Sequence, residues 1–510
     1  MEVDFSIKHK ADRFREILES LLKNYQPQYY AVVVSNILND VFNKREQFGR
    51  YPPHFLLHSI QSNCVYYRSN RSQELSEKKL QKILNHYRQY FDPVAMHFLE
   101  KDDGLTPFFI NMFRQQFFLQ WGHGSNSLGR MIMLFNLGKY PKSKAFFVKR
   151  YGMSFDQWLL TGSAIHAYIS KKKQQTISPL YYFNSDEKIV PDSVIDSFFE
   201  INSILSTEIK NYHEKIEEKV GQSHSLFYDT YLQGVFVEKP ILQLNEIEYL
   251  VVHKELFLRK ITEGIFDICK KELPSDFGVE FGENFERYIE KLLLNFIPKT
   301  KVFKENQLRQ YTSEKICDFM VVFEDYIYLI ESKGVEYSAH IASENAMKQD
   351  NSTRKISTGF EQLYSVKEMI NSGTFASLIG ESEHKKIIAS VITYKQIIAA
   401  NTDWYYEKNI VPSLKKINSE KVESFQYRPQ ILSIIELELL LKYCNDTNKS
   451  YLDVFKERLE DNNHVLMGEW YNFFKLKTDG IPFLANTFKD YFDKLLSSVS
   501  LKDNYIIETI

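Results

Sequence analysis

The sequence predicts a protein of the α+β or α/β class, with helices in the N-terminal half and a sheet in the C-terminal half. In residues 11–25 and 76–91, apolar residues recur three and four positions apart, which is typical of amphipathic helices. Residues 315–334 contain two apolar runs around the acidic pair Glu324-Asp325, and their period of two predicts a β-hairpin. The long apolar faces on both sides of this hairpin fit a sheet that is covered by helices.

The rest of the N-terminal half divides into shorter predicted elements. Residues 171–195 are polar and include two prolines, so we expect a connector or a long loop there. Residues 196–220 show helical spacing, and residues 227–244 have the composition of short strands. Residues 245–273 predict one long helix, which ends before Pro274.

The C-terminal half alternates between helical spacing and the period of two that is typical of strands. The predicted elements are a helix at 281–296, a strand at 299–309, the hairpin at 315–334, a helix at 358–370, a strand at 385–395, and a strand that turns into a helix within 428–443. Residues 445–510 predict a helical tail. The order from the first of these helices is therefore helix, three strands, helix and strand.

Three charged residues lie at the ends of the predicted hairpin strands. Asp318 stands early in the first apolar run, and Glu331 and Lys333 close the second. Because Glu331 and Lys333 are two positions apart, they leave their strand on the same face, and Asp318 can reach that face from the neighbouring strand. Charges in strands that are otherwise suited to burial are costly unless they have a role. A divalent metal ion with a water to activate would explain all three.

The pattern D-x12-E-x-K, formed by Asp318, Glu331 and Lys333, resembles that of the PD-(D/E)xK nuclease superfamily. The helix before it contains G-x-x-F-E at residues 282–286, which is similar to the first-helix signature of the family. The proline of the family name is replaced by Cys317, at a position that varies widely in the family. The resemblance implies a restriction-endonuclease-like αβββαβ core and a hydrolase that acts on phosphodiester bonds.

The same resemblance implies roles for the residues of the hairpin. Asp318 and Glu331, with the backbone carbonyl of Ser332, would ligate Mg²⁺ or Mn²⁺, which prefer oxygen ligands. Lys333 would orient or deprotonate the attacking water, or neutralise the charge that develops on the phosphate. These residues form the catalytic and metal-binding set that the resemblance assigns to the hairpin.

The two predicted helices beside the hairpin each offer a further site residue by the same resemblance. Glu286 would hold a second metal ion or a metal-bound water, and Glu283, which lies three residues earlier on nearly the same face, is the alternative. Gln362 would approach the metal site or the scissile phosphate, and the alternative is a solvated helix residue.

Other motifs carry weaker signals. His54 and His58 are four apart, but the Glu of H-E-x-x-H is missing, which favours core or surface histidines over a metal pair. Residues 121–130 are Gly-rich but lack G-K-[ST], which favours an inter-helix turn over a phosphate loop. Lysines 171–173 are interpreted as a solvated loop. The basic residues within 348–355 would hold phosphates or belong to an ordinary surface loop.

Composition limits the function classes. The chain has 510 residues, of which 44% are hydrophobic, so it can form two to four domains with substantial cores. The formal charge of -2 gives no global basic field, so any nucleic-acid surface has to be a local patch. The four cysteines are scattered and form no zinc or disulfide pattern, which favours a reducing cytoplasm. No apolar run approaches the roughly 20 residues of a membrane helix, so no membrane partner is expected.

These observations lead to an expected function and domain organisation. We expect a metal-dependent nuclease acting on DNA rather than RNA, and by analogy a bacterial restriction or anti-phage defence effector. The alternative is a non-catalytic nucleic-acid- or protein-binding module on a degenerate nuclease fold. The expected domains are a mainly helical recognition or regulatory region at 1–265, which offers a surface for a protein partner or a second copy, a nuclease domain at 266–445, and a helical extension at 446–510.

Overall fold

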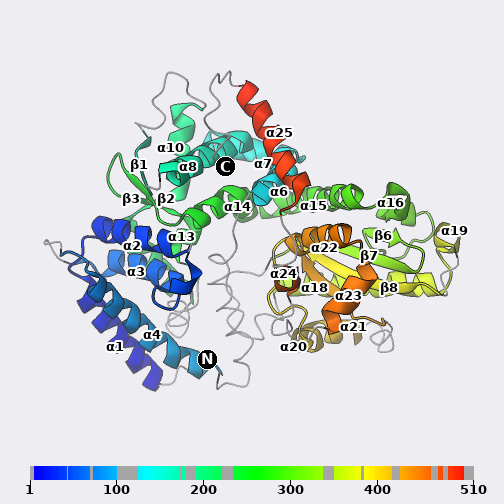
Figure 1. Cartoon of the computed structure of the whole chain (residues 1–510), viewed down its shortest axis with the longest axis horizontal. Coiled ribbons are helices and arrows are strands. Elements are labelled where there is room, and N and C mark those ends of the chain that lie inside the picture. The colour runs from blue at the N-terminus through cyan, green and yellow to red at the C-terminus, as the bar shows by residue number, and fades with distance from the viewer. Residues whose placement is uncertain are drawn as a thin grey trace. The chain divides into compact units, whose positions relative to one another are not determined.

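The protein has a mixed α+β fold, shown by a computed structural model of the chain (Figure 1). The structure describes residues 5–42, 44–68, 73–99, 125–172, 175–179, 190–220, 234–336, 350–380, 384–415, 425–460, 469–474 and 480–498. The chain forms two compact units: unit 1 consists of residues 1–277 and 486–510, and unit 2 consists of residues 278–485. None of the described helices is long and apolar enough to cross a membrane.

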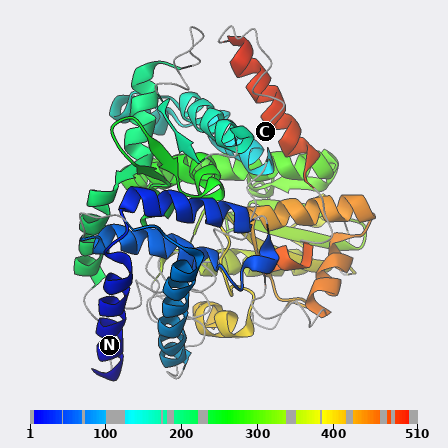
Figure 2. The same ribbon diagram turned by 60° about the vertical axis from the view of Figure 1, so that its left-hand side comes forward.

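Unit 1 consists mostly of helices, seen from two sides in Figures 1 and 2. They are α1 (Phe5–Leu22), α2 (Pro27–Phe42), α3 (Pro53–Tyr66), α4 (Glu77–Leu99), α6 (Ser125–Met131), α7 (Pro141–Tyr151), α8 (Phe155–Lys172), α10 (Asp192–Asn202), α11 (Ser206–Val220), α13 (Val235–Glu238) and α14 (Lys254–Glu272). Helices α1 and α4 pack side by side, with the ring of Phe14 stacked on His86 at a centroid distance of 4.5 Å. The apolar residues that predicted these two helices therefore lie on the faces by which the helices contact each other.

Unit 1 also contains a small mixed sheet. Its strands are β1 (Thr176–Ile177), β2 (Ser203–Leu205), β3 (Ile241–Gln243) and β4 (Tyr249–Val251), in the order β1-β4-β3-β2. Strand β4 is antiparallel to both of its neighbours, whereas β2 and β3 are parallel. Each strand has only two or three residues, so the sheet is a small element compared with the helices of unit 1.

The sheet corrects two predictions about this region. The single helix predicted for 245–273 is wrong in its first part, because Tyr249–Val251 pairs with β1 and β3 and only Lys254–Glu272 is helical. The change occurs at His253, whose ring Nδ1 accepts a hydrogen bond from the backbone N–H of Leu256 and thereby caps the helix. The predicted helix 196–220 is likewise interrupted by β2.

Two other predictions for unit 1 are partly correct. In the predicted connector 171–195, the described residues include the end of α8, strand β1 and the start of α10, and residues 180–189 lie outside the description. In the segment 227–244, which was predicted to hold short strands, β3 is present but Val235–Glu238 is helical. Residues 227–233 of that segment also lie outside the description.

Unit 2 follows the predicted order of elements closely. The helices are α15 (Pro274–Phe296, from Gly278 on in this unit), α16 (Glu305–Leu308), α18 (Asn351–Asn371), α19 (Ala376–Ile379), α20 (Asp403–Tyr405), α21 (Val411–Lys415), α22 (Ile434–Thr447), α23 (Tyr451–Glu460) and α24 (Trp470–Phe474), and α25 (Pro482–Ser498) begins here. The strands are β5 (Val302–Lys304), β6 (Phe319–Val322), β7 (Tyr326–Lys333), β8 (Lys386–Thr393) and β9 (Gln430–Ser433). The described part of the predicted tail 445–510 is helical.

The five strands of unit 2 form one mixed sheet in the order β5-β6-β7-β8-β9. Strands β6 and β7 are antiparallel, with Phe319 opposite Ile330, so the predicted hairpin is confirmed. Strand β8 runs parallel to β7 and β9 runs parallel to β8. The change from strand to helix predicted within 428–443 is also confirmed, and it falls at Ser433, whose hydroxyl accepts a hydrogen bond from the N–H of Glu436.

Helices cover both faces of this sheet. Successive side chains of β7 point to opposite faces. Tyr328 packs against Phe455 of α23, with ring centroids 5.6 Å apart. On the opposite face, Gly359 of α18 lies against Val391 of β8 and Glu331 of β7. The carboxylate of Glu331 therefore belongs to the layer between the sheet and α18.

The strand predicted at 299–309 is much shorter than expected. Only Val302–Lys304 is extended, and it pairs with β6, whereas Glu305–Leu308 forms a helical turn. The turn starts because the side chain of Gln307 accepts a hydrogen bond from the N–H of Lys304 at 3.0 Å. The N–H of Glu305 also donates to the carbonyl of Asp318 at 2.9 Å, which ties this turn to the start of β6.

Candidate active site

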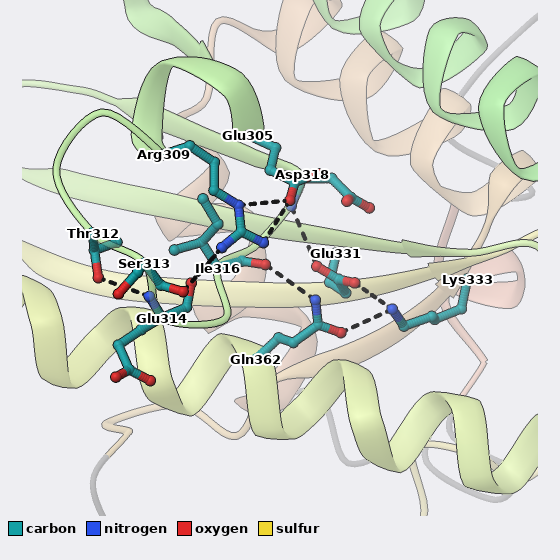
Figure 3. Close-up of polar contacts among 10 residues, drawn as sticks. All are labelled: Glu305, Arg309, Thr312, Ser313, Glu314, Ile316, Asp318, Glu331, Lys333 and Gln362. Carbon is teal, nitrogen blue, oxygen red and sulfur yellow. Dashed lines mark hydrogen bonds and ion pairs between the residues drawn. The ribbon is translucent and has the colours of Figure 1, made fainter.

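The structure brings the charged ends of the hairpin together (Figure 3). Asp318 is the residue directly before β6, and Glu331 and Lys333 are among the last three residues of β7, before Gly334. The apolar residues between them are buried, which fixes the register of the two strands and hence the positions of these three side chains. The hairpin thus positions a polar cluster, formed by Asp318, Glu331 and Lys333, at the end opposite its turn.

Asp318 is held in place by Ser332. Its carboxylate accepts a hydrogen bond from the backbone N–H of Ser332 at 2.7 Å and another from the Ser332 hydroxyl. The N–H of Asp318 donates in turn to the carboxylate of Glu331 at 3.3 Å. Sequence analysis assigned only a backbone carbonyl role to Ser332 and missed its hydroxyl. The signal was a hydroxyl residue between Glu331 and Lys333, which becomes informative only when the register is known.

Lys333 lies between two acceptors. Its ammonium forms an ion pair with Glu331, whose side chain is 1% exposed, and donates to the Oε1 atom of Gln362 at 2.9 Å. The Gln362 amide then donates to the carbonyl of Ile316 at 3.1 Å. Gln362 of α18 is therefore part of the cluster rather than a solvated helix residue, and it joins Lys333 to the chain that leads into Asp318.

The two glutamates considered on α15 occupy different environments. Glu283 is 62% exposed and pairs with Arg287 of its own helix at 3.5 Å. Glu286 is half-buried, and the charges of Asp318 and Glu305 act on it. Of the two, Glu286 is the carboxylate whose ionisation Asp318 affects.

The carboxyl groups of the cluster resist ionisation. Burial, followed by the negative charge of Asp318, raises the pKa of Glu331 to about 8, although Lys333 opposes this effect. Burial and then the charges of Asp318 and Glu305 raise the pKa of Glu286 to about 7. Burial also raises the pKa of Asp318, against the hydrogen bonds from Ser332. A cation placed among these groups would offset their mutual repulsion.

The donor set fits a hard divalent cation. Asp318 and Glu331 provide carboxylate oxygens, and Ser332 provides a backbone carbonyl. Mg²⁺ is commonly bound through one or two carboxylates while it keeps several waters. Across the described residues, no group of three or more His, Cys, Asp or Glu side chains is gathered as a ready metal site. The arrangement is therefore compatible with a two-carboxylate site, with Glu286 outside the direct ligand set.

The weaker sequence candidates lie elsewhere. His54 is half-buried, and desolvation lowers the pKa of its ring to about 3, as expected for a neutral histidine rather than a charged surface one. Residues 121–124 of the Gly-rich segment lie outside the description, and the rest of it begins α6. Lys171 and Lys172 are in the last turn of α8. On α18, Arg354 and Lys355 are exposed, whereas residue 348 lies outside the description.

Gly359 allows α18 to approach Glu331 closely. A Cβ atom at this position would lie 3.3 Å from the Cγ atom of Glu331 and 3.1 Å from a methyl group of Val391. We expect Gly359→Ala to displace Glu331 and to raise the Mg²⁺ concentration that half-saturates the protein by about tenfold, since such sites need a precision of about 0.5 Å. Isothermal titration calorimetry with Mg²⁺ measures this shift.

Gly282 on α15 provides the matched control for that substitution. A Cβ atom there meets nothing within 4 Å. Gly282→Ala is therefore expected to leave the Mg²⁺ titration unchanged and to stabilise the helix by about 0.5–1 kcal/mol. An unshifted titration for Gly359→Ala would show that the contact with Glu331 has no bearing on metal use.

Comparison of the chain with protein-family models, with curated proteins and with solved structures finds no match.

Proposed function

We propose that unit 2 is a metal-dependent nuclease with a restriction-endonuclease-like core of the PD-(D/E)xK type. The observation that carries the proposal is the meeting of Asp318, Glu331 and Lys333 at the open end of one buried hairpin. The succession of α15, β5 to β7, α18 and β8 supports it, because it is the αβββαβ order expected for such a core.

The proposed chemistry needs only a few protein groups. When bound by Asp318, Glu331 and the carbonyl of Ser332, Mg²⁺ or Mn²⁺ supplies a Lewis acid for a phosphate oxygen and for water. Ser332 fixes the orientation of Asp318 through two hydrogen bonds. Lys333 holds an ammonium group beside Glu331, where it can orient the attacking water or stabilise charge on the phosphate. Gln362 limits the rotamers of Lys333 by accepting one of its hydrogen bonds.

We further propose that unit 1 recognises the substrate, a partner or a second copy of the chain, and that DNA is the substrate. Support for this division of roles comes from the polar cluster, whose residues all belong to unit 2, and from the sequence of unit 1, which contains no strong catalytic motif. A restriction or anti-phage defence role in the cytoplasm is the corresponding biological proposal, by analogy.

One observation favours the non-catalytic alternative. The ammonium of Lys333 is engaged by both Glu331 and Gln362, so the cluster is internally satisfied as a buried ion pair. A degenerate nuclease fold that only binds nucleic acid or protein would retain such a network for stability. The two functions differ in whether a phosphodiester bond is cleaved.

Incubation of the purified protein with plasmid, linear DNA and RNA tests the proposal directly. We expect cleavage of DNA with Mg²⁺ or Mn²⁺ and none with EDTA, because chelation removes the Lewis acid that the proposed reaction requires. Asp318→Asn, purified identically, controls for contaminating nucleases, since it keeps the shape of the side chain. Binding without cleavage under all metal conditions would support the non-catalytic alternative instead.

A further inference from the structure

An exposed loop borders the polar cluster of unit 2. It comprises residues 309–316, between α16 and β6, and we call it the rim loop (Figure 3). Apart from Thr312, which is half-buried, its residues from Arg309 to Lys315 are exposed, whereas Ile316 is buried. The loop ends two residues before Asp318. Its position makes it the exposed part of the chain closest in sequence to the proposed metal ligand.

The conformation of the rim loop is fixed by its own side chains. The guanidinium of Arg309 donates to the carboxylate of Glu305 at 2.8 and 3.1 Å and to the carbonyl of Glu314 at 2.7 Å. The N–H of Glu314 donates to the hydroxyl of Thr312 at 3.1 Å, which forms a tight turn. A loop held in this way presents its remaining side chains in defined positions, which lowers the entropy cost of binding a ligand.

The rim loop is connected to the proposed catalytic lysine through one side chain. Gln362 donates to the carbonyl of Ile316 in the loop and accepts from the ammonium of Lys333. A ligand held by the rim loop is therefore positioned relative to Lys333 by a chain of two hydrogen bonds.

The exposed side chains of the rim loop are an aromatic ring and a lysine. Tyr311 is 37% exposed although its ring contacts Phe375, with centroids 6.1 Å apart and planes inclined by 68°. Lys315 is exposed on the same loop. Partly exposed aromatic rings and cations on one surface are the combination by which proteins bind unpaired bases and the phosphates that link them.

The charge of the surrounding segment agrees with a polyanionic ligand. Residues 299–315 contain five Lys and Arg residues and two Glu residues, a net charge of +3, whereas the whole chain has a formal charge of -2. This segment includes the edge strand β5 and the rim loop. It is a local basic region of the kind that a nucleic-acid-binding protein of balanced overall charge requires.

We propose that the rim loop binds an unpaired nucleotide of the substrate strand, with Tyr311 stacked on its base and Lys315 on its backbone. The proposal rests on the nuclease function proposed for unit 2 and specifies its substrate as single-stranded DNA or an unpaired region of DNA. A base inside a duplex offers no free face to a ring on a loop, so the preference follows from the chemistry of stacking.

Fluorescence anisotropy of the full-length protein with a dye-labelled single strand of about 20 thymidines, in EDTA to prevent cleavage, tests the proposal. Tyr311→Ser is expected to weaken binding of the single strand about tenfold, and Tyr311→Phe to restore it, because stacking needs the ring and not the hydroxyl. Binding of the matching duplex should change far less. With Mg²⁺, Tyr311→Ser should raise KM and leave kcat nearly unchanged, which a merely structural loss would not do.

Leu294 of α15, which is in unit 2 but outside the polar cluster, provides the control, since it is 38% exposed. Leu294→Ser should bind like the parent protein. If the parent protein binds and cleaves DNA but Tyr311→Ser behaves identically, or loses duplex and single-strand binding equally, the rim-loop proposal is wrong and the nuclease function stands. If the parent protein neither binds nor cleaves any nucleic acid, the proposed function fails and the rim-loop proposal fails with it.

Discussion

Lys333→Met is expected to reduce the rate of metal-dependent DNA cleavage by about 10²–10⁴-fold, the usual range for loss of a proton-transfer or charge-stabilising group. The methionine keeps the length of the side chain, so the packing against α18 is preserved while the ammonium is removed. The binding of DNA should change much less than the rate, because the ammonium acts on the reacting phosphate. Single-turnover cleavage at saturating protein measures the chemical step separately from binding.

Lys449→Met provides the matched control for this substitution. Lys449 forms an exposed ion pair with Glu457 outside the cluster, and exposed ion pairs contribute about 0–1 kcal/mol. We expect this variant to cleave at the parent rate. Equal cleavage by Lys333→Met and Lys449→Met would show that the polar cluster is not the catalytic site, whatever the substrate.

In the absence of divalent cations, unit 2 is expected to lose stability as the pH rises from about 5.5 to about 7.5. In the folded protein, burial and Asp318 raise the pKa of Glu331 to about 8, whereas an unfolded glutamate has a pKa of about 4.3. Between these values the folded state binds more protons than the unfolded state. The free energy of unfolding is therefore lowered by up to about 1.4 kcal/mol per pH unit for this carboxyl group.

Mg²⁺ should reverse this loss at the upper end of the pH range. The cation binds the ionised carboxylates, so its stabilising effect should be larger at about pH 7.5 than at about pH 5.5. Hydrogen exchange of peptides from β7, with and without Mg²⁺, measures the effect within unit 2. The expected result is stronger protection by Mg²⁺ at the higher pH.

Glu331→Gln distinguishes this linkage from a general effect of pH. The amide cannot ionise and keeps the size of the side chain, so the contribution of Glu331 to the pH slope should disappear, together with most of the Mg²⁺ protection. The contribution of Glu286, whose pKa is also raised, to about 7, should remain. Glu283→Gln is the control, because Glu283 is exposed and pairs only with Arg287 among the contacts described for it. An unchanged slope in Glu331→Gln would mean that the carboxylates of the cluster do not govern the stability of unit 2.

The hairpin could be predicted from the sequence because its signal is local. Two apolar runs of period two flank Glu324-Asp325, and the alternation of side chains holds for any strand. That property alone placed Glu331 and Lys333 on one face. The helix at the start of unit 2 and the strand-to-helix change at Ser433 were likewise predictable, since each depends on residues within a few positions of one another.

Elements whose state depends on distant partners were predicted incorrectly. Tyr249–Val251 is apolar enough for a helix or a strand, and pairing with β1 and β3 decides in favour of the strand. Strand β5 ends at Lys304 because the chain turns there to bring Glu305 against the carbonyl of Asp318. Neither contact can be recognised from the sequence of the segment itself.

By itself, the sequence determined which side chains could carry the chemistry: two carboxylates and a lysine at fixed spacing in one hairpin, and carboxylates on the preceding helix. The tertiary structure alone decided which of them meet. Glu283 and Glu286 differ by only about 60° around α15, yet packing leaves Glu286 half-buried, where the charge of Asp318 acts on it, and leaves Glu283 in solvent. Gln362 joins partners 29 and 46 residues away. Such contacts depend on how the helices pack on the sheet, and the local periodicity of the sequence does not predict them.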